Sequence, residues 1–157
     1  MRGCSFRSGG WKITILLPEA LQKVSSFLSS RSGGTAQTRP FLRLAAEQLE
    51  ASLSEEGGSA VFLSAPTGYG KTSLSMSIAL KEFLEGYKAI ISYPLRTLIE
   101  DQFGKFQDFF ADLGKPEAVG RRMMGVRESP YLVHPVVLTT IDTLSLVAVG
   151  LSPEDIA

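Results

Sequence analysis

The sequence predicts an α/β fold in which a mainly parallel sheet lies between layers of helices. Two observations predict this class. Three short apolar runs, at residues 60–63, 89–93 and 136–140, are typical of strands buried on both faces. Amphipathic helical patterns alternate with these runs along the chain. The 157 residues, of which 44% are hydrophobic and 20% charged, are enough to bury the core of a globular domain.

Charge and cysteine content exclude several classes of function. The 16 basic and 16 acidic residues cancel, so the chain lacks the excess positive charge of a small self-sufficient nucleic-acid-binding domain. Any contact with nucleic acid must therefore be local. Cys4 is the sole cysteine and His134 the sole histidine, which argues against an internal disulfide and a His-rich metal site. We expect a cytoplasmic protein without membrane contact, because the apolar run at 13–17 is too short for a signal peptide or a membrane helix.

Residues 1–38 are predicted to be a helical extension followed by a linker. A loop and a short strand are expected up to residue 16, and Pro18 then opens an amphipathic helix. Residues 29–38 are rich in Ser, Gly and Thr without apolar periodicity, which predicts a mobile connector. The main domain is therefore placed at residues 39–157.

In the main domain, helices with 3.6-residue apolar spacing end at glycines and separate the predicted strands. The first helix begins at Pro40, carries Phe41, Leu44, Ala45, Leu49 and Leu53 on its apolar stripe, and ends at Gly57-Gly58. Strand 60–63 follows, and then a helix marked by Leu74, Ile78 and Phe83 that ends near Gly86. Next come strand 89–93 and a long helix from Leu95 to Leu113. Strand 136–140 leads directly into the start of another helix, and a last helix is predicted to start at Ser152-Pro153.

The segment between strand 60–63 and the next helix predicts a phosphate-binding loop. It reads Ser64-Ala-Pro-Thr-Gly-Tyr-Gly-Lys-Thr72, which is a Walker A pattern in which Ala65 replaces the first glycine. Gly68 and Gly70 let backbone N–H groups approach phosphate oxygens, and the following helix directs its positive end to the same point. The predicted nucleotide-binding residues are Pro66, Thr67, Gly68, Tyr69, Gly70, Lys71, Thr72 and Ser73.

Two residues of this loop are predicted to be catalytic. Lys71 would reach the β and γ phosphates of ATP, and the Thr72 hydroxyl would ligate the magnesium ion that bridges them. The alternative is a glycine-containing turn that only permits tight packing between a strand and a helix.

The loop belongs to a larger set of motifs that resembles superfamily 2 helicases. Ala65-Pro-Thr-Gly-Tyr-Gly-Lys-Thr72 is similar to motif I of that superfamily, and Tyr93-Pro-Leu-Arg-Thr-Leu-Ile-Glu-Asp-Gln102 is similar to its motif Ia. Val137-Leu-Thr-Thr-Ile-Asp-Thr-Leu144 resembles a later motif of the Thr-x-Asp kind. The combination looks most like the helicase of type I CRISPR interference, over roughly residues 39–150.

This resemblance implies the amino-terminal part of a RecA-like, P-loop domain of an ATP-dependent helicase or translocase that uses ATP and Mg²⁺. It also implies that Arg96 and Thr140 contact the phosphates of nucleic acid, with single-stranded DNA in antiviral defence as the expected substrate. The implied partners are the remaining helicase domains, a separate nuclease and a CRISPR surveillance complex. The alternative for Arg96 is a solvated surface charge, and for Thr140 a helix N-cap.

Two departures from the resembled family are visible in the sequence. Leu42 stands where the family has an adenine-reading glutamine, and no Asp-Glu pair is present to hold magnesium and position water. We therefore expect this chain alone to bind ATP weakly and to hydrolyse little. A small P-loop ATPase or kinase that uses Asp142, or a non-catalytic nucleotide-binding module, remain the alternative functions.

Overall fold

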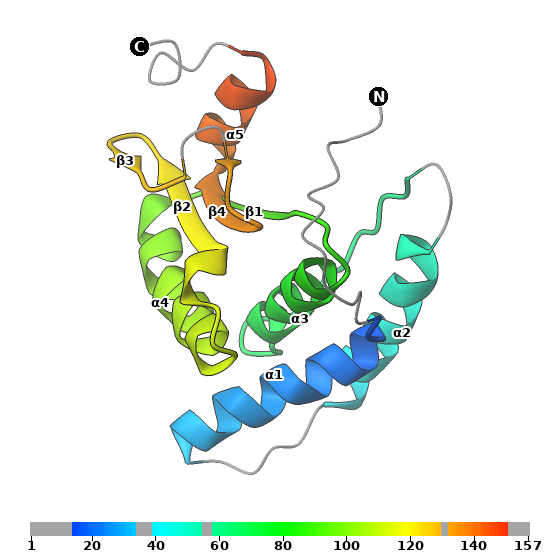
Figure 1. Cartoon of the computed structure of the whole chain (residues 1–157). Helices are drawn as coiled ribbons and strands as arrows, with labels where there is room; N and C mark the ends of the chain where they lie inside the picture. The colour runs from blue at the N-terminus through cyan, green and yellow to red at the C-terminus, as the bar shows by residue number, and fades with distance from the viewer. Residues whose placement is uncertain (1–13, 34–38, 55–57, 130–131, 151–157) are drawn as a thin grey trace. The chain divides into compact units, whose positions relative to one another are not determined.

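The computed structural model describes residues 14–33, 39–54, 58–129 and 132–150, and the last predicted helix start, at Ser152-Pro153, lies outside them (Figure 1). The chain divides into two compact units between Glu85 and Gly86. The described part of the first unit is helical, and the described part of the second contains a sheet. No helix among these residues combines the length and the apolar character needed to cross a membrane.

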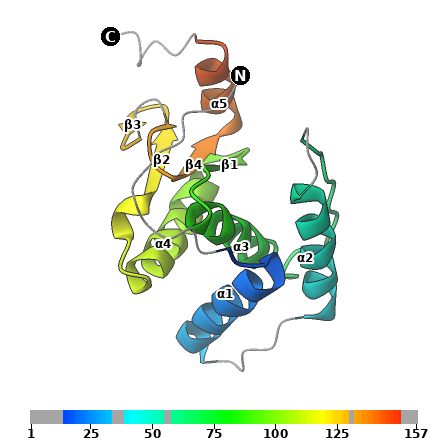
Figure 2. The same cartoon turned by 45° about the vertical axis from the view of Figure 1, so that its right-hand side comes forward.

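The described part of the first unit contains three helices. They are α1 (Leu17–Ser32), α2 (Pro40–Leu53) and α3 (Lys71–Leu84). A proline lies at the start of both α1 and α2, where its missing N–H costs no helical hydrogen bond. Helix α1 packs against α2 and α3 (Figure 2). Their shared core consists of Leu17, Leu21, Leu42, Ala45, Ala46 and Leu74.

Helix α1 differs from the sequence prediction at both ends. Residues 14–16 are not a strand, and the helix continues through residues 29–32, which were predicted to belong to the connector. Serine disfavours a helix only slightly, so the helix that begins in the packed turns continues through these residues. It ends at Gly33, which adopts the left-handed conformation (φ 67°).

The inward face of α2 also differs from the predicted stripe. Leu42, Ala45 and Ala46 are buried, whereas Phe41 and Leu44 are exposed. The prediction is confirmed for Ala45 and for the half-buried Leu49, which packs against the core, and it is wrong for Phe41, Leu44 and Leu53. Phe41 lies instead beside the glycine-rich loop, against the ring of Tyr69.

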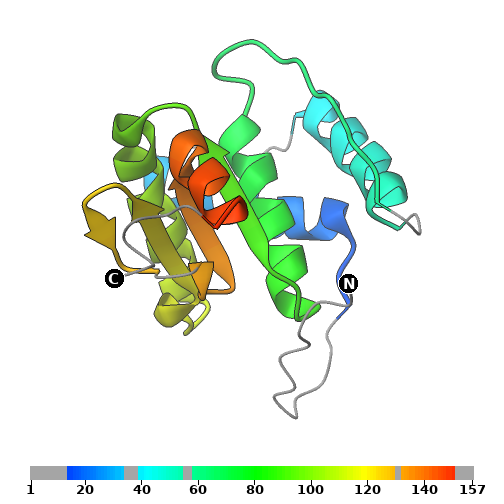
Figure 3. The same cartoon turned by 90° about the horizontal axis from the view of Figure 1, so that it is seen from above.

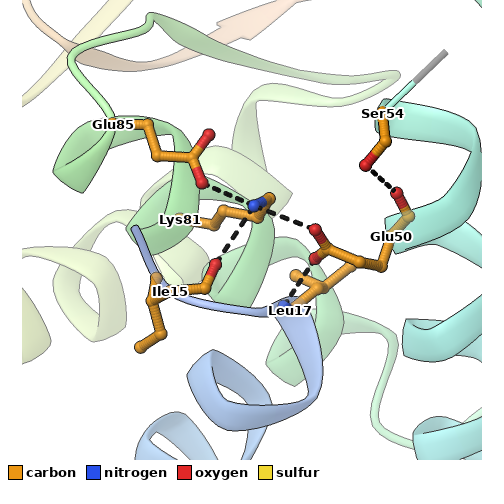
Figure 4. A network of polar contacts seen from close by, with 6 residues as sticks. All are labelled: Ile15, Leu17, Glu50, Ser54, Lys81 and Glu85. Atoms are coloured by element: carbon orange, nitrogen blue, oxygen red, sulfur yellow. Dashed lines mark hydrogen bonds and ion pairs between the residues drawn. The ribbon is translucent and has the colours of Figure 1, made fainter. Parts of the chain in front are cut away.

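A buried ammonium group joins the three elements of the first unit (Figure 4). The Lys81 Nζ on α3 lies 2.6 Å from Glu85 Oε1 and 3.1 Å from Glu50 Oε1 on α2. It also donates to the Ile15 carbonyl at 3.1 Å, just before α1. The N-cap residue of α1, Leu16, has no side chain that could accept a hydrogen bond from the first turn. Glu50 Oε2 of α2 takes this role, because it accepts the Leu17 N–H at 2.6 Å.

The surroundings of Lys81 determine its ionisation. Burial by itself lowers the pKa of Lys81, but hydrogen bonds to Glu85 and Glu50 and their charges raise it above its ordinary value of 10.5. A basic group whose pKa is higher in the folded than in the unfolded protein stabilises the fold. This stabilisation is fully present below the pKa of the unfolded state, and it is lost as the pH rises through the pKa of the folded state. The ionised Lys81 therefore stabilises the fold throughout the neutral range, and this contribution is lost in strongly alkaline solution as the ammonium deprotonates.

The run at residues 60–63, predicted to be a buried strand, is not a strand in the structure. Residues 58–66 form an extended connection between α2 and α3 without regular structure (Figure 3). Phe62 is 97% exposed, and Val61 and Leu63 are exposed as well. A strand exists only when its backbone pairs with a neighbour, and no strand of the described residues pairs with this segment. The prediction of a buried strand was therefore wrong for this structure.

The second unit contains an open sheet whose order is β1-β4-β2-β3. Its strands are β1 (Ala89–Tyr93), β2 (Val119–Met123), β3 (Val126–Arg127) and β4 (Val136–Thr140). Strands β1, β4 and β2 are parallel, and β3 pairs antiparallel with β2. All five residues of β4 are buried, as expected for a central parallel strand. The predicted α/β fold with a mainly parallel sheet is thus confirmed.

Helices α4 (Arg96–Asp112) and α5 (Ile141–Ala148) pack on this sheet. Helix α4 provides the crossover from β1 to β2 that a parallel arrangement requires, with the short 3₁₀ helix η1 (Pro116–Ala118) before β2. Four phenylalanines of α4 are buried: Phe103, Phe106, Phe109 and Phe110. Arg121 of β2 ties the helix to the sheet through its guanidinium, which contacts Glu100 and lies 4.6 Å from the Phe103 ring centroid.

Strands β2 and β3 were not among the predicted elements. The β2 segment contains a glycine and two arginines, so it lacks the apolar run that identified the other strands. Arg122 is nevertheless fully buried. The imidazole of His134 packs against Gly120, and a Cβ on Gly120 would overlap it, with Cε1 2.9 Å away.

Replacing Lys81 by methionine should destabilise the protein by about 3 kcal/mol, because it leaves the carboxylates of Glu50 and Glu85 without their buried partner. Thermal or urea unfolding at pH 7 measures the effect. Lys23→Met, an exposed site on α1, is the matched control and should change stability by less than about 0.5 kcal/mol. Equal unfolding midpoints for the two variants would contradict the role given to the network.

Gly120→Ala should destabilise the second unit by about 1–3 kcal/mol, because the new methyl group collides with His134. Gly104→Ala is the control, since a Cβ at that helical position of α4 meets open space and should be neutral or slightly stabilising. The double change Gly120→Ala with His134→Ala should recover part of the loss. Additive destabilisation in the double variant would show that the imidazole is not the obstacle.

Candidate nucleotide-binding site

The predicted phosphate loop lies immediately before α3 and has a backbone that only glycine adopts easily. Gly68 and Gly70 have φ values of +81° and +91°, in the left-handed region. A turn covers residues 67–69, in which the Tyr69 N–H faces the Pro66 carbonyl at 3.4 Å. Side chains at residues 68 and 70 would oppose this conformation, so the spacing of the two glycines sets the curvature of the loop.

The first turn of α3 presents unsatisfied backbone donors at the end of the loop. Gly70 is the N-cap residue and has no side chain, so the N–H groups that follow have no side-chain cap. The positive end of the helix dipole lies at the same place. This combination of donors and field suits an anion such as a phosphate group.

Lys71 is exposed and bends back over the loop. Its Nζ donates to the Ala65 carbonyl at 2.7 Å, so the ammonium lies at the loop and within reach of an anion bound there. Thr72 and Ser73 are half-buried in the first turn of α3. Pro66, Thr67, Gly68 and Tyr69 are exposed in the loop itself. The eight predicted nucleotide-binding residues are consecutive in the sequence, and in the structure they form the end of the loop and the first turn of α3.

The donor set fits ATP with magnesium. Backbone N–H groups and the Lys71 ammonium suit phosphate oxygens, and the Thr72 hydroxyl suits Mg²⁺, which proteins commonly bind through few side chains together with substrate phosphates. Within the described ranges, no three His, Cys, Asp or Glu residues lie close enough to hold a metal ion on their own. A magnesium ion at this loop would therefore depend on the nucleotide for most of its ligands.

The start of α2 forms one wall of the loop, a feature that sequence reasoning missed. Leu42, noted in the sequence only as a replacement for glutamine, packs so closely that a Cβ on Gly70 would lie 2.7 Å from its Cδ1. Arg39 donates from Nη1 to the Gly68 carbonyl at 2.7 Å. An arginine before Pro40 gives no periodic signal, so nothing in the sequence indicated this contact.

Two aromatic rings meet beside the loop. Phe41 and Tyr69 have ring centroids 6.1 Å apart and lie edge to face at 87°. The Arg39 guanidinium carbon lies 5.3 Å from the Tyr69 centroid. Such cation–π and edge contacts add modest attraction in exposed positions, and together they join the start of α2 to the tip of the loop.

The second unit places the predicted nucleic-acid residues at one edge of its sheet. Tyr93 at the end of β1 is paired with Thr140 at the end of β4, and Arg96 begins α4 three residues after Tyr93. Arg96 is exposed. The carboxyl ends of parallel strands are where open α/β sheets bind ligands.

Thr140 itself is buried, and its hydroxyl caps α5. Thr140 Oγ1 accepts from the Thr143 N–H at 3.4 Å and donates to Thr143 Oγ1 at 2.9 Å. Asp142 lies exposed in the first turn of α5, where its charge favours the helix dipole. A phosphate at this edge would therefore meet the Arg96 guanidinium and the start of α5 rather than a free Thr140 hydroxyl.

The chain matches a known protein family. The family model of the DEAD/DEAH box helicases matches residues 45–147, which is well over half of the chain and includes the predicted phosphate loop, β1, Arg96 at the start of α4, and β4 with Thr140. Proteins of this family use ATP, usually with magnesium, and the match supports an ATP-dependent helicase or translocase function that includes nucleic-acid binding. The chain belongs to the DEAD/DEAH box helicase family.

Proposed function

We propose that residues 64–73 bind the phosphates of ATP and that the chain is the amino-terminal part of the ATP-binding domain of a nucleic-acid translocase. The observation that carries this proposal is the loop with two left-handed glycines in front of a helix whose first turn no side chain caps. Bound ATP with magnesium would supply the phosphoanhydride bond whose hydrolysis drives movement.

The residues of the chain have distinct roles in this proposal. Lys71 leaves the Ala65 carbonyl and donates to phosphate oxygens, which exchanges a neutral acceptor for a charged one and so strengthens the bond. The first-turn N–H groups of α3 fix the orientation of the phosphates. Thr72 directs its hydroxyl toward the metal. The Asp-Glu pair that would position the attacking water does not occur in the sequence, so we propose binding without appreciable turnover by this chain alone.

Nucleic acid is proposed to bind at the edge of the second unit where β1 and β4 end. The exposed guanidinium of Arg96 suits a backbone phosphate, and a contact of this kind is independent of base sequence. Because the chain has no net charge, such contacts must be concentrated locally.

The finer proposal is a CRISPR-associated, cytoplasmic helicase that acts on single-stranded DNA, with a nuclease and a surveillance complex as partners. It is supported by the likeness of the segments around Arg96 and Thr140 to the motifs of the type I interference helicase. Binding of DNA in preference to RNA of the same sequence is the first measurement that bears on it.

Lys71→Ala should weaken the binding of ATP in the presence of Mg²⁺ by about 10–100-fold, because a charge-assisted hydrogen bond contributes about 1.5–3 kcal/mol. Fluorescence anisotropy with a labelled ATP analogue measures the affinity. Lys23→Ala removes an exposed lysine of α1 and should leave binding unchanged. Equal affinities of wild type and Lys71→Ala would overturn the proposed site, and turnover by the chain without nucleic acid would favour the small-ATPase alternative.

Arg96→Ala should weaken the binding of a labelled 20-nucleotide oligo(dT) several-fold and lower the slope of log affinity against log salt by about 0.7, as the loss of one phosphate contact requires. Lys105→Ala is the control, because nine residues along α4 place Lys105 on the opposite side of the same helix. A similar effect of both changes would indicate a general charge effect rather than a site at Arg96.

A further inference from the structure

Three side chains at the start of α2 contact the phosphate loop. Arg39 contacts Gly68 and the ring of Tyr69, Phe41 contacts the same ring, and Leu42 packs against Gly70. Arg39 is the N-cap residue of α2, with extended backbone (φ −63°, ψ 138°) that directs the chain into the helix.

The tip of the loop has little to hold it in place by itself. A Cβ on Gly68 would meet no atom within 4 Å, so packing at this position does not fix the backbone. The residues on either side, Thr67 and Tyr69, are exposed. Glycine has the greatest backbone freedom of any residue, so a loop of this composition needs contacts from outside to hold one conformation.

The hydrogen bond from Arg39 determines the orientation of one peptide group. The Gly68 carbonyl and the Tyr69 N–H belong to the same planar peptide and point in opposite directions. The Tyr69 N–H faces the Pro66 carbonyl at 3.4 Å, which is a long hydrogen bond, whereas the Gly68 carbonyl accepts from Arg39 at 2.7 Å. The stronger contact is therefore the one made by Arg39, and it fixes the direction of both groups.

We propose that Arg39 is a positioning residue for the phosphate loop. By donating to the Gly68 carbonyl and covering Tyr69, it holds the loop in the conformation that receives phosphate before any nucleotide arrives. Binding then requires less ordering of the loop, and preorganisation of this kind strengthens affinity. This inference rests on the proposed function of residues 64–73, and it assigns Arg39 an effect through the loop rather than a contact with the base.

A comparison of ATP with inorganic tripolyphosphate separates these two roles. If Arg39 acts through the loop, Arg39→Ala should weaken both ligands by a similar factor, roughly tenfold for loss of a charged hydrogen bond. Isothermal titration calorimetry on the 157-residue chain with Mg²⁺ measures both affinities. Arg39→Lys keeps a charged donor without the planar guanidinium over Tyr69, and it should recover part of the loss.

Arg43→Ala is the matched control, because Arg43 lies one turn further along α2, is exposed, and pairs with Glu47 rather than with the loop. It should leave both affinities unchanged. Equal effects of Arg39→Ala and Arg43→Ala, or a loss for ATP with no loss for tripolyphosphate, would overturn the inference. Thermal melting of each variant shows whether it is folded, and Arg39→Lys provides the same comparison if Arg39→Ala is not.

The failure of this inference is distinguishable from failure of the proposed function. Lys71→Ala is titrated with the same two ligands. If Lys71→Ala weakens both and Arg39→Ala weakens neither, the nucleotide site stands and the positioning role does not. If Lys71→Ala has no effect on either ligand, the site itself is wrong.

Discussion

The buried ammonium of Lys81 is the interaction on which the arrangement of the first unit depends. It contacts Glu50 of α2, Glu85 just after α3 and the carbonyl of Ile15 before α1, so one charge connects three segments that are distant in sequence. Lys81 lies ten residues after Lys71 on α3, which is about 15 Å along the helix. The same helix that this network anchors thus presents its first turn to the phosphate loop, and the stability of the core fixes the position of the site.

Helix α2 has two functions, and they explain why its apolar face differs from a simple amphipathic stripe. Ala45 and Ala46 pack into the core, while Phe41 and Arg39 lie against the loop. Leu42 belongs to both, because it is part of the core and also closes over Gly70. A helix that serves a core and a loop must spread its contacts around more of its circumference than a surface helix does.

The second unit shows how a parallel sheet brings together residues that are proposed to bind nucleic acid. Strand β4 is buried along its whole length between two parallel neighbours, and its register with β1 is fixed by the pairing of Tyr93 with Thr140. Residues that follow the carboxyl ends of such strands necessarily lie at one edge. Arg96 and the start of α5 therefore lie at the same edge although more than forty residues separate them in the sequence.

The sequence by itself determined the α/β class, the glycine-containing turn before α3 and the strand at 136–140, because each depends on local features such as glycine spacing, a helix start or a continuous apolar run. Only the tertiary structure decided that residues 60–63 lack a strand partner, that Arg122 is buried in β2, and that Arg39 contacts Gly68. Each of these depends on which distant segments meet, and no periodic pattern within a single segment encodes such a meeting.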